Sequence, residues 1–355
     1  MNKFVYIKNW WTEIDKVNLI LILLLSLIGI ILSFSLNDSY LFFNKHLVFS
    51  ITGMFIMIFL SFFDVKFIRR LSLISIIFFI LILIAVLFVD YEIKGSKRWF
   101  KLYSLSIQPS EFIKPFFFVL SAWCITQGIN RRNLYLIALV TFFIIICSLI
   151  ILQPDFGMTF LISITFFCQL FVAGLSLFLI IIAGVSLIAF SIFSFYFFDH
   201  VQQRVNTFFN PTADTYQIDL SLKAFKSGGL LGKGPGQGIL KERIPDANTD
   251  FIFAVAGEEL GFIFCSIIVL LILFLIIRFL LKLLRMKDPF KIIATVGLTC
   301  SFGLQSLFNI FSSLDLIPTK GMTLPLISYG GSSMISSAIL FGFLLSLTKK
   351  ANEER

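Results

Sequence analysis

Charged residues are scarce in this chain. Only 14% of its 355 residues are Asp, Glu, Lys or Arg, whereas soluble domains carry about a quarter. Hydrophobic residues make up 58% of the sequence, and the mean hydropathy is +0.97. A soluble core of this size could not bury so much apolar surface, so the composition excludes a soluble globular protein. It predicts that lipid surrounds much of the chain.

Patterns that hold metals, disulfides or nucleotides are also lacking. The five cysteines lie inside apolar runs without a CxxC pair, which argues against a disulfide framework or a zinc site. The two histidines, His46 and His200, are too few for a metal cluster. The glycine-rich segment 228–238 lacks a preceding strand and a GK[ST] ending, which excludes a nucleotide fold. We interpret it as flexible turns that let the backbone approach a ligand.

Long uncharged stretches are what the sequence does contain. The first follows a polar segment of 16 residues and has no small-residue cleavage site, so we predict a transmembrane helix rather than a signal peptide. A spanning helix needs about 20 residues, so the run Phe156–His200 must hold two helices, with a turn at 173–176. The spans are then Val17–Asn37, His46–Phe63, Leu71–Val89, Pro115–Asn130, Asn133–Pro154, the two within Phe156–His200, Leu260–Ile277, Ile292–Leu314 and Gly321–Thr348. We predict an all-α polytopic membrane protein with about ten transmembrane helices, in a single domain over residues 1–355.

Lys and Arg in the short loops predict the orientation. With the N-terminus in the cytoplasm, the inner segments hold sixteen of these residues and the short outer segments hold six. Both termini are therefore expected in the cytoplasm, and the net charge of +9 is a topology signal rather than a sign of nucleic-acid binding. One large extracytoplasmic loop, residues 199–250, then lies between helices 7 and 8. Within it, the amphipathic segment Tyr216–Ser227 is expected to form an interfacial helix.

Charged residues next to the spans gather in three clusters on the outer side, and each has a structural and a functional interpretation. In the first, Glu111 and Lys114 follow a helix start at Pro109 and share one helix face. They form either a structural ion pair or part of a site. Arg98, beside Trp99, is either an interface anchor or a site residue.

The second and third clusters are acidic. Asp155 lies in a tight turn between two helices and either caps the next helix or serves the site. Asp250 lies where the large loop meets a helix, with the same two alternatives. Glu258 and Glu259 come two turns later, and their directions differ by about 100° because they are adjacent on a helix.

Taken together, these motifs resemble the SEDS family (shape, elongation, division and sporulation) of peptidoglycan glycosyltransferases. The resemblance covers essentially the whole chain and rests on the following segments: Lys97–Trp99, Gln108–Lys114, Gln153–Gly157, Arg204 with Phe209–Pro211, Tyr216–Leu222, Gly232–Gly234, Thr249–Phe253, Glu258–Glu259 and Pro318–Ser333. The segment Pro318–Pro325 is more similar to the division branch than to the elongation branch. The chain departs from the family at Asn248, where histidine is common.

The resemblance implies an activity. Family members join lipid II units into glycan strands at the outer face of the bacterial cytoplasmic membrane and release undecaprenyl pyrophosphate. A division role would place the protein at the septum with a class B penicillin-binding protein transpeptidase and other divisome proteins, and no nucleic acid is expected. The alternatives are a lipid II flippase and a non-catalytic division scaffold, and transporters usually bind their substrate near the midplane rather than at one side.

The same resemblance nominates site residues. Asp250 is the predicted catalytic base for the acceptor hydroxyl, because such a group must lose a proton as it attacks, or else it positions a metal that activates this hydroxyl. Asp155, Asp246, Glu258 and Glu259 are predicted supporting acids. A divalent cation, Mg or Mn, could assist, although the sequence shows no ligand set for it. The candidates for binding the pyrophosphate and sugars are Lys97, Arg98, Glu111, Lys114, Arg204, Gln217, Ser221, Lys320 and Ser328.

Overall fold

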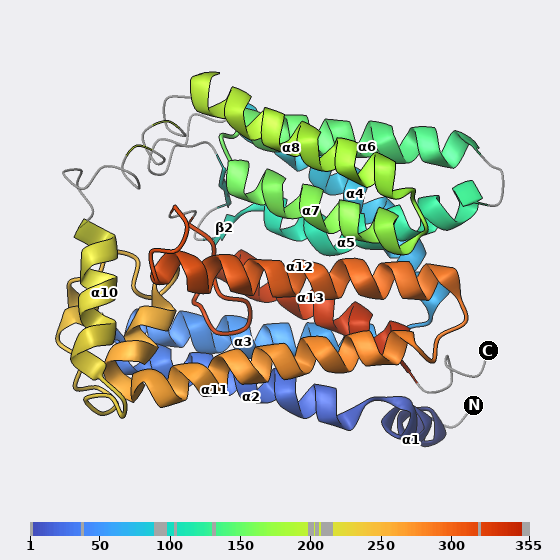
Figure 1. Cartoon of the computed structure of the whole chain (residues 1–355). Helices are drawn as coiled ribbons and strands as arrows, with labels where there is room; N and C mark the ends of the chain where they lie inside the picture. The colour runs from blue at the N-terminus through green and yellow to red at the C-terminus, as the bar shows by residue number, and fades with distance from the viewer. Residues whose placement is uncertain are drawn as a thin grey trace.

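The computed structural model is a bundle of long helices that run side by side (Figure 1). It describes residues 3–36, 39–88, 98–102, 105–129, 133–197, 202, 206, 216–318 and 321–349. Its elements are α1 (Lys3–Glu13), α2 (Lys16–Ser35), α3 (Ser39–Ser61), α4 (Val65–Leu87), β1 (Phe100–Leu102), β2 (Leu105–Ile107), α5 (Pro109–Ile129), α6 (Asn133–Leu152), α7 (Phe156–Val172), α8 (Leu177–Phe197), α10 (Tyr216–Gly228), η1 (Leu240–Glu242), α11 (Ile252–Leu283), α12 (Pro289–Ser313) and α13 (Gly331–Leu347).

The predicted membrane architecture is confirmed. Among the described residues, seven helices are long and apolar enough to span a bilayer: α2, α3, α4, α5, α6, α11 and α12. Two more, α7 and α13, are apolar but have only 17 residues, and α8 is an uncharged helix of 21 residues. These ten follow the ten predicted spans in order, and the predicted turn at 173–176 separates α7 from α8. The protein is a multi-pass membrane protein.

Several boundaries differ from those predicted by the uncharged runs. The last helix begins at Gly331 instead of Gly321, because Pro325 has no N–H to donate and Leu326 adopts a φ of 69°. Helix α4 begins at Val65 and so includes three basic residues that the prediction left outside. Strands β1 and β2 form a small antiparallel hairpin that an all-α prediction omits.

The helix α1 was not predicted either. It precedes the first span and is anchored by Trp10, whose ring stacks on Phe62 with centroids 4.4 Å apart. The indole Nε1 of Trp10 also donates to Ser61 Oγ at 3.0 Å. A short polar helix of this kind carries no long apolar run, so a search for uncharged stretches misses it.

Helices α5, α7 and α12 are joined inside the bundle by one buried amide. Gln169 of α7 donates to the carbonyl of Phe118 at 2.8 Å and to that of Ile293 at 3.1 Å, and it accepts from Ser121 Oγ at 2.6 Å. Hydrogen bonds of this type hold transmembrane helices together, because lipid offers no competing partner. These hydrogen bonds hold α5, α7 and α12 together inside the bundle.

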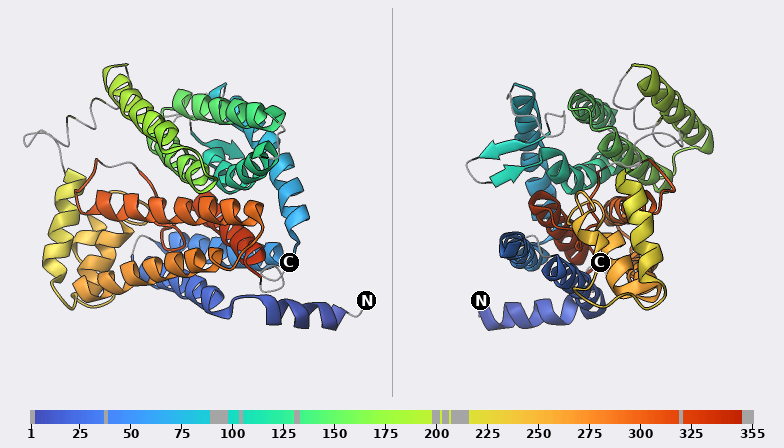
Figure 2. Two further views of the ribbon diagram at one scale, coloured as in Figure 1. Left: turned by 45° about the vertical axis from the view of Figure 1, so that its right-hand side comes forward. Right: turned by 90° about the vertical axis from the view of Figure 1, so that its left-hand side faces the viewer.

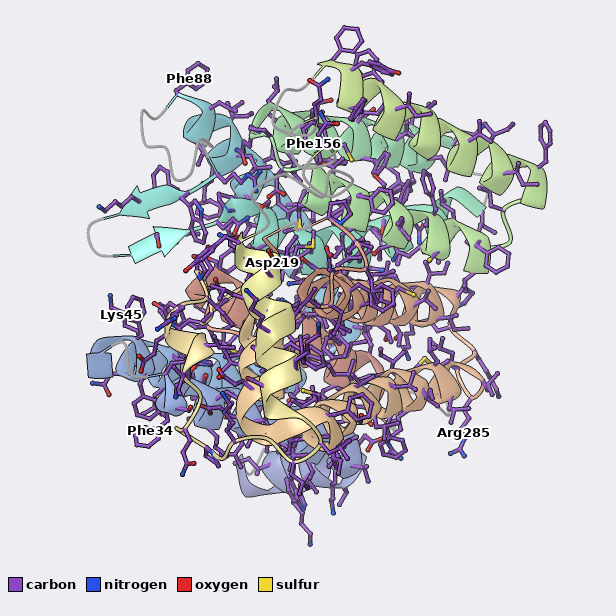
Figure 3. All side chains as sticks on the ribbon, turned by 60° about the vertical axis from the view of Figure 1, so that its left-hand side comes forward. Phe34, Lys45, Phe88, Phe156, Asp219 and Arg285 are labelled. Carbon is purple, nitrogen blue, oxygen red and sulfur yellow. The ribbon has the colours of Figure 1, made fainter. Side chains whose placement is uncertain are left out.

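The two ends of the bundle are different. Helix α10 lies across one end, which we call the α10 end, whereas α1 and the last turn of α13 lie at the opposite end (Figures 1 and 2). Figure 3 looks toward the α10 end, with Asp219 marking α10 in front of the other helices. The predicted helix Tyr216–Ser227 is confirmed as α10, and its interfacial location stays a prediction. The cytoplasmic location of the termini also stays a prediction.

Candidate active site

The first turns of α5 bring together the ion pair that the sequence spacing predicts. Lys114 Nζ lies 2.7 Å from Glu111 Oε2, and the two side chains are only 3% and 7% exposed. The ammonium also donates to Gln305 Oε1 of α12 at 2.5 Å. Buried charges must be paired in this way, since an isolated charge is costly within a membrane. The ion-pair interpretation is thus confirmed, and a role of the pair in the site stays a prediction.

Two amide side chains on α12 connect this ion pair to the segment before α13. Gln305 Nε2 donates to the carbonyl of Thr323 at 3.1 Å. One turn further along the same face, Asn309 Nδ2 donates to the carbonyl of Met322 at 2.7 Å and to that of Asp250 at 2.8 Å. We call Gln305 and Asn309 the α12 clamp. It links the Lys114 ammonium, the 322–323 backbone and the backbone of Asp250.

Asp250 itself lies at the end of a compact turn. The turn is closed by the carbonyl of Asp246, which accepts from the N–H groups of Thr249 and Asp250, each at 3.0 Å. Helix α11 begins at Ile252, and its N-cap position, Phe251, makes no side-chain capping bond. Phe251, rather than Asp250, therefore occupies the N-cap position of α11.

The carboxylate of Asp250 faces the segment before α13. A Cβ placed on Gly321 would lie 3.4 Å from Asp250 Oδ2, so the two are in contact range. Asp250 is partly exposed, in contrast to the buried Glu111 and Lys114. Asp250 thus combines solvent access with a fixed backbone, and Asp246 in the same turn is also partly exposed.

Ser328 ties the Asp250 turn to the loop before α13. Its hydroxyl donates to the carbonyl of Thr249 at 2.6 Å and accepts from the N–H of Leu324 at 2.8 Å. The N–H of Tyr329 donates to the carbonyl of Asn248 at 2.9 Å. Because Asn248 contributes its backbone carbonyl, this contact survives the departure from the histidine that is common in the family.

The second predicted cluster forms around the turn between α6 and α7. Arg98 lies 3.6 Å from the carboxylate of Asp155 and donates to the carbonyls of Gln153, at 3.1 Å, and Pro154. Asp155 also caps α7 by accepting from the N–H of Met158 at 3.3 Å. Both of these side chains are therefore engaged within the protein.

The two acids of α11 organise the neighbouring loop. The carboxylate of Glu258 is fully buried and accepts from the backbone N–H groups of three consecutive residues, 239–241, at 2.9–3.0 Å. The carboxylate of Glu259 accepts from Lys241 Nζ at 2.6 Å and from the hydroxyl of Ser35. The two side chains thus have different neighbours, as their helical spacing predicts. Both are occupied by the protein itself.

The remaining candidates are dispersed. Ser221 is fully buried and donates to the carbonyl of Ser313 at 2.7 Å, which attaches α10 to the end of α12. Gln217 lies one turn earlier on α10 and is partly exposed. Lys97, Arg204 and Lys320 lie outside the described residues. Over the described part of the chain, no group of three or more His, Cys, Asp or Glu side chains gathers to hold a metal.

Sequence reasoning missed Gln305, Asn309 and Lys241. The two amides are uncharged, so a search for charges in apolar runs passes over them. Polar side chains four residues apart in an otherwise apolar helix are the signal that could have found them. Lys241 has no such signal, since it is one of several lysines in the large loop.

Comparison with known proteins agrees with this architecture. A family model described as cell cycle protein, for FtsW, RodA and SpoVE, matches residues 10–353. A protein of Caulobacter vibrioides named probable peptidoglycan glycosyltransferase FtsW is 37% identical, over 96% of this chain and 90% of its own length.

Solved structures share the fold. A chain of a peptidoglycan synthase complex, studied for its coordination of polymerization and crosslinking, superposes with a TM-score of 0.80 at 24% identity over 94% of this chain and 97% of its own. The rod shape determining protein RodA of Thermus thermophilus gives a TM-score of 0.73 at 24% identity, over 95% of this chain and 97% of its own. With its motifs, its ten apolar helices and a match along nearly its whole length, the chain belongs to the FtsW/RodA/SpoVE family of cell cycle proteins, the SEDS family.

Proposed function

We propose that the protein is a peptidoglycan glycosyltransferase that polymerises lipid II into glycan strands at the outer face of the cytoplasmic membrane during cell division. The observation that carries the proposal is the α12 clamp, which fixes the backbone of the partly exposed Asp250 and contacts the buried ammonium of Lys114. The family membership and the name of the Caulobacter vibrioides relative support it. A lipid carrier embedded in the bilayer would present its sugars at such an end of the bundle.

Asp250 is the general base in this proposal. The 4-hydroxyl oxygen of the acceptor sugar forms a bond to the anomeric carbon of the donor, and the bond from that carbon to the pyrophosphate breaks. The hydroxyl proton passes to the carboxylate of Asp250, and undecaprenyl pyrophosphate leaves. General bases contribute about 10²–10⁴-fold to such reactions when they are held in position. The hydrogen bond from Asn309 to the Asp250 carbonyl supplies that positioning.

The leaving pyrophosphate needs positive charge. Lys114 and Arg98 are engaged by Glu111 and by the α6–α7 turn, so we assign them to shaping and charging the wall of the site. Direct contact with the pyrophosphate is proposed for Lys97, Arg204 and Lys320. In the alternative to the general-base role, Asp250 would hold a divalent cation, because Mg²⁺ is usually bound through one or two carboxylates, and the cation would supply positive charge for the leaving group.

The other predicted residues have supporting roles. Glu258 and Glu259 hold the loop that leads to Asp250, and Asp246 closes the turn before it through its carbonyl. Ser221 and Ser328 join backbone segments around the site. Gln217, on the partly exposed side of α10, remains the candidate for a sugar contact.

We further propose that a class B penicillin-binding protein supplies the crosslinking activity. The structural relative described as a peptidoglycan synthase complex supports this pairing. In this proposal the α1 end lies in the cytoplasm, and the protein works at the septum with other divisome proteins. Its substrates are lipid II and the lipid-linked glycan strand. The Lys and Arg distribution supports this orientation.

Polymerisation of lipid II by the purified protein in lipid vesicles, with and without the transpeptidase, tests the proposal. Glycan strands are the expected product. Movement of lipid II across the vesicle membrane without strands would favour a flippase, and neither result would favour a scaffold.

The α12 clamp provides a matched pair of variants for the same assay. Asn309→Asp removes both N–H donors and sets a carboxylate against two carbonyl oxygens. An unpaired buried charge also lowers folded yield, so the rate is measured per folded molecule, and we expect kcat to fall by about tenfold or more. Ser306→Ala, on the same helix, loses only a 2.9 Å bond to the carbonyl of Phe302 and should retain activity. Equal rates for the two variants would refute the positioning role of Asn309.

A further inference from the structure

Helix α11 is interrupted near the α10 end. Gly261 has a φ of 77° and a ψ of −179°, which no helix contains. The loop that follows α10 replaces the helical hydrogen bonds lost there: the N–H groups of Lys233 and Gly234 donate to the carbonyls of Glu258 and Glu259 at 3.0 and 2.9 Å. On the other side of the break, the N–H groups of residues 262 and 263 donate to the carbonyls of residues 229 and 230 at 2.9 and 3.2 Å.

Helix length puts the break within reach of the hydrocarbon core. Phe262 precedes Arg278 by sixteen residues, which is about 24 Å along a helix. Arg278 binds Asp15 at 2.9 Å, at the entrance to the first span near the α1 end. A hydrocarbon core is about 30 Å thick, so a core that begins near Arg278 reaches beyond Phe262.

Complete pairing of the backbone is what this depth requires. Unsatisfied N–H and C=O groups are excluded from hydrocarbon, and irregular backbone is tolerated there only where other groups bond it. Besides the exchange across the break, the loop has three consecutive N–H groups, at residues 239–241, bound by the carboxylate of Glu258. The loop backbone at residues 232–234 and 239–241 is thus paired within the protein.

Close contact presses the loop against α11. A Cβ on Gly232 would lie 2.1 Å from the carbonyl oxygen of Glu259, and one on Gly261 would lie 2.6 Å from the carbonyl oxygen of Leu230. Gly232 of the loop and Gly261 of the helix therefore allow the two backbones to pack in direct contact. This differs from the flexible approach to a ligand that the sequence suggested.

The side chains at the tip of the loop face outward and are apolar. Leu230 is 68% exposed and Leu231 is 80% exposed, and beside them on α11 Phe262 is 65% exposed. The tip therefore continues the lipid-facing surface of a membrane-spanning helix. In Figure 1 this loop lies below α10, against the near end of α11.

We propose that Leu230 and Leu231 insert among the acyl chains of the leaflet at the α10 end and dock the large loop onto the bilayer. The occupant of this surface is bilayer lipid, because the tip is continuous with the lipid-facing side of α11. The same loop runs on through η1 to Asp246–Asp250, so its insertion sets the height of that turn above the membrane. The inference rests on the membrane fold and is independent of the proposed reaction.

Spin-label depth measurements test the proposal. A nitroxide is attached through Leu231→Cys, in full-length chain whose native cysteines are replaced by alanine, and the protein is placed in phosphatidylcholine–phosphatidylglycerol vesicles. Phe274→Cys on α11 is the lipid-facing control, and Lys223→Cys on the exposed side of α10 is the aqueous control. We expect the label at 231 to be relaxed by oxygen and protected from a water-soluble nickel complex, as at 274.

Two results would overturn the proposal. Nickel access at 231 equal to that at 223 would place the tip in water, and protection from both agents would show that protein, such as a second copy of the chain, covers it. If the cysteine-free protein does not fold, a photoactivatable diazirine amino acid replaces Leu231 in the native chain, and its crosslinking partners show whether the tip lies in lipid. Crosslinks to acyl chains are expected, and crosslinks only to protein or water would refute insertion.

Discussion

Lys241→Met tests whether the buried network under the large loop holds the fold. Lys241 and Glu259 are each 1% exposed, and Lys241 Nζ lies 2.6 Å from Glu259 Oε1. The ammonium also donates to the carbonyl and the hydroxyl of Ser35, at 2.5 and 3.1 Å. Removing the lysine leaves a carboxylate without its countercharge in the interior, which costs about 3–5 kcal/mol of unfolding free energy.

A double-mutant cycle separates the charge from the packing. Glu259→Gln keeps the shape and strands the ammonium instead, so it should cost a similar amount. The double variant Lys241→Met/Glu259→Gln has no buried charge and should be more stable than either single variant, because replacing a whole buried pair is often nearly neutral.

Denaturant unfolding of the purified protein in detergent, followed by tryptophan fluorescence, measures these differences. Lys223→Met on the exposed side of α10 is the control and should unfold like the wild type. Additive losses in the double variant, or a wild-type midpoint for Lys241→Met, would refute the reasoning.

Three further changes test other parts of the structure. Lys114→Met leaves the buried Glu111 unpaired and should lower folded yield and unfolding free energy by about 3–5 kcal/mol, whereas full activity at normal abundance would make the pair incidental. Gly232 has a φ of 80°, and a Cβ there would overlap the carbonyl oxygen of Glu259, whereas Gly236 has a similar φ of 79° but open space around it. Gly232→Ala should therefore lower the unfolding midpoint more than Gly236→Ala, and equal midpoints would contradict the close contact. Burial alone would raise the pKa of Asp15, but hydrogen bonds from Lys282 and Asn18 and the charges of Lys282 and Arg278 hold that pKa below its ordinary value. The stabilisation that the Asp15 carboxylate gives is therefore present above the unfolded pKa of about 3.9 and is lost as pH falls through the folded pKa. Asp15→Asn should lower the unfolding midpoint at pH 7, and its difference from wild type should shrink below about pH 4. A difference that grows on acidification would contradict a lowered pKa of Asp15.

The sequence predicts the helices well because charge avoids lipid. Uncharged runs predict the order of the ten apolar helices among the described residues, and the predicted turn at 173–176 divides the longest run correctly. Local spacing also predicts the helix start at Pro109 and the contact between Glu111 and Lys114. These features depend on residues within a few turns of one another.

The rest depends on partners that are distant in the sequence. The bond between Gly229 and Phe262 exists only because a loop lies against a helix break, and no periodicity encodes it. The role of Gln305 depends on its hydrogen bond with Lys114, which lies 191 residues earlier in the sequence. Likewise Lys241 looks like a surface lysine until Ser35 and Glu259 enclose it.

Asp250→Asn in the lipid II polymerisation assay tests the central claim most directly. The substitution keeps the shape and leaves the carbonyl of residue 250 free to accept from Asn309, but the amide cannot take the acceptor proton. The exposed Glu242→Gln in η1 serves as the control. We predict normal abundance, a normal unfolding midpoint and a polymerisation rate lower by about 10²–10⁴-fold. A rate close to wild type for Asp250→Asn would contradict the assignment of Asp250 as the base.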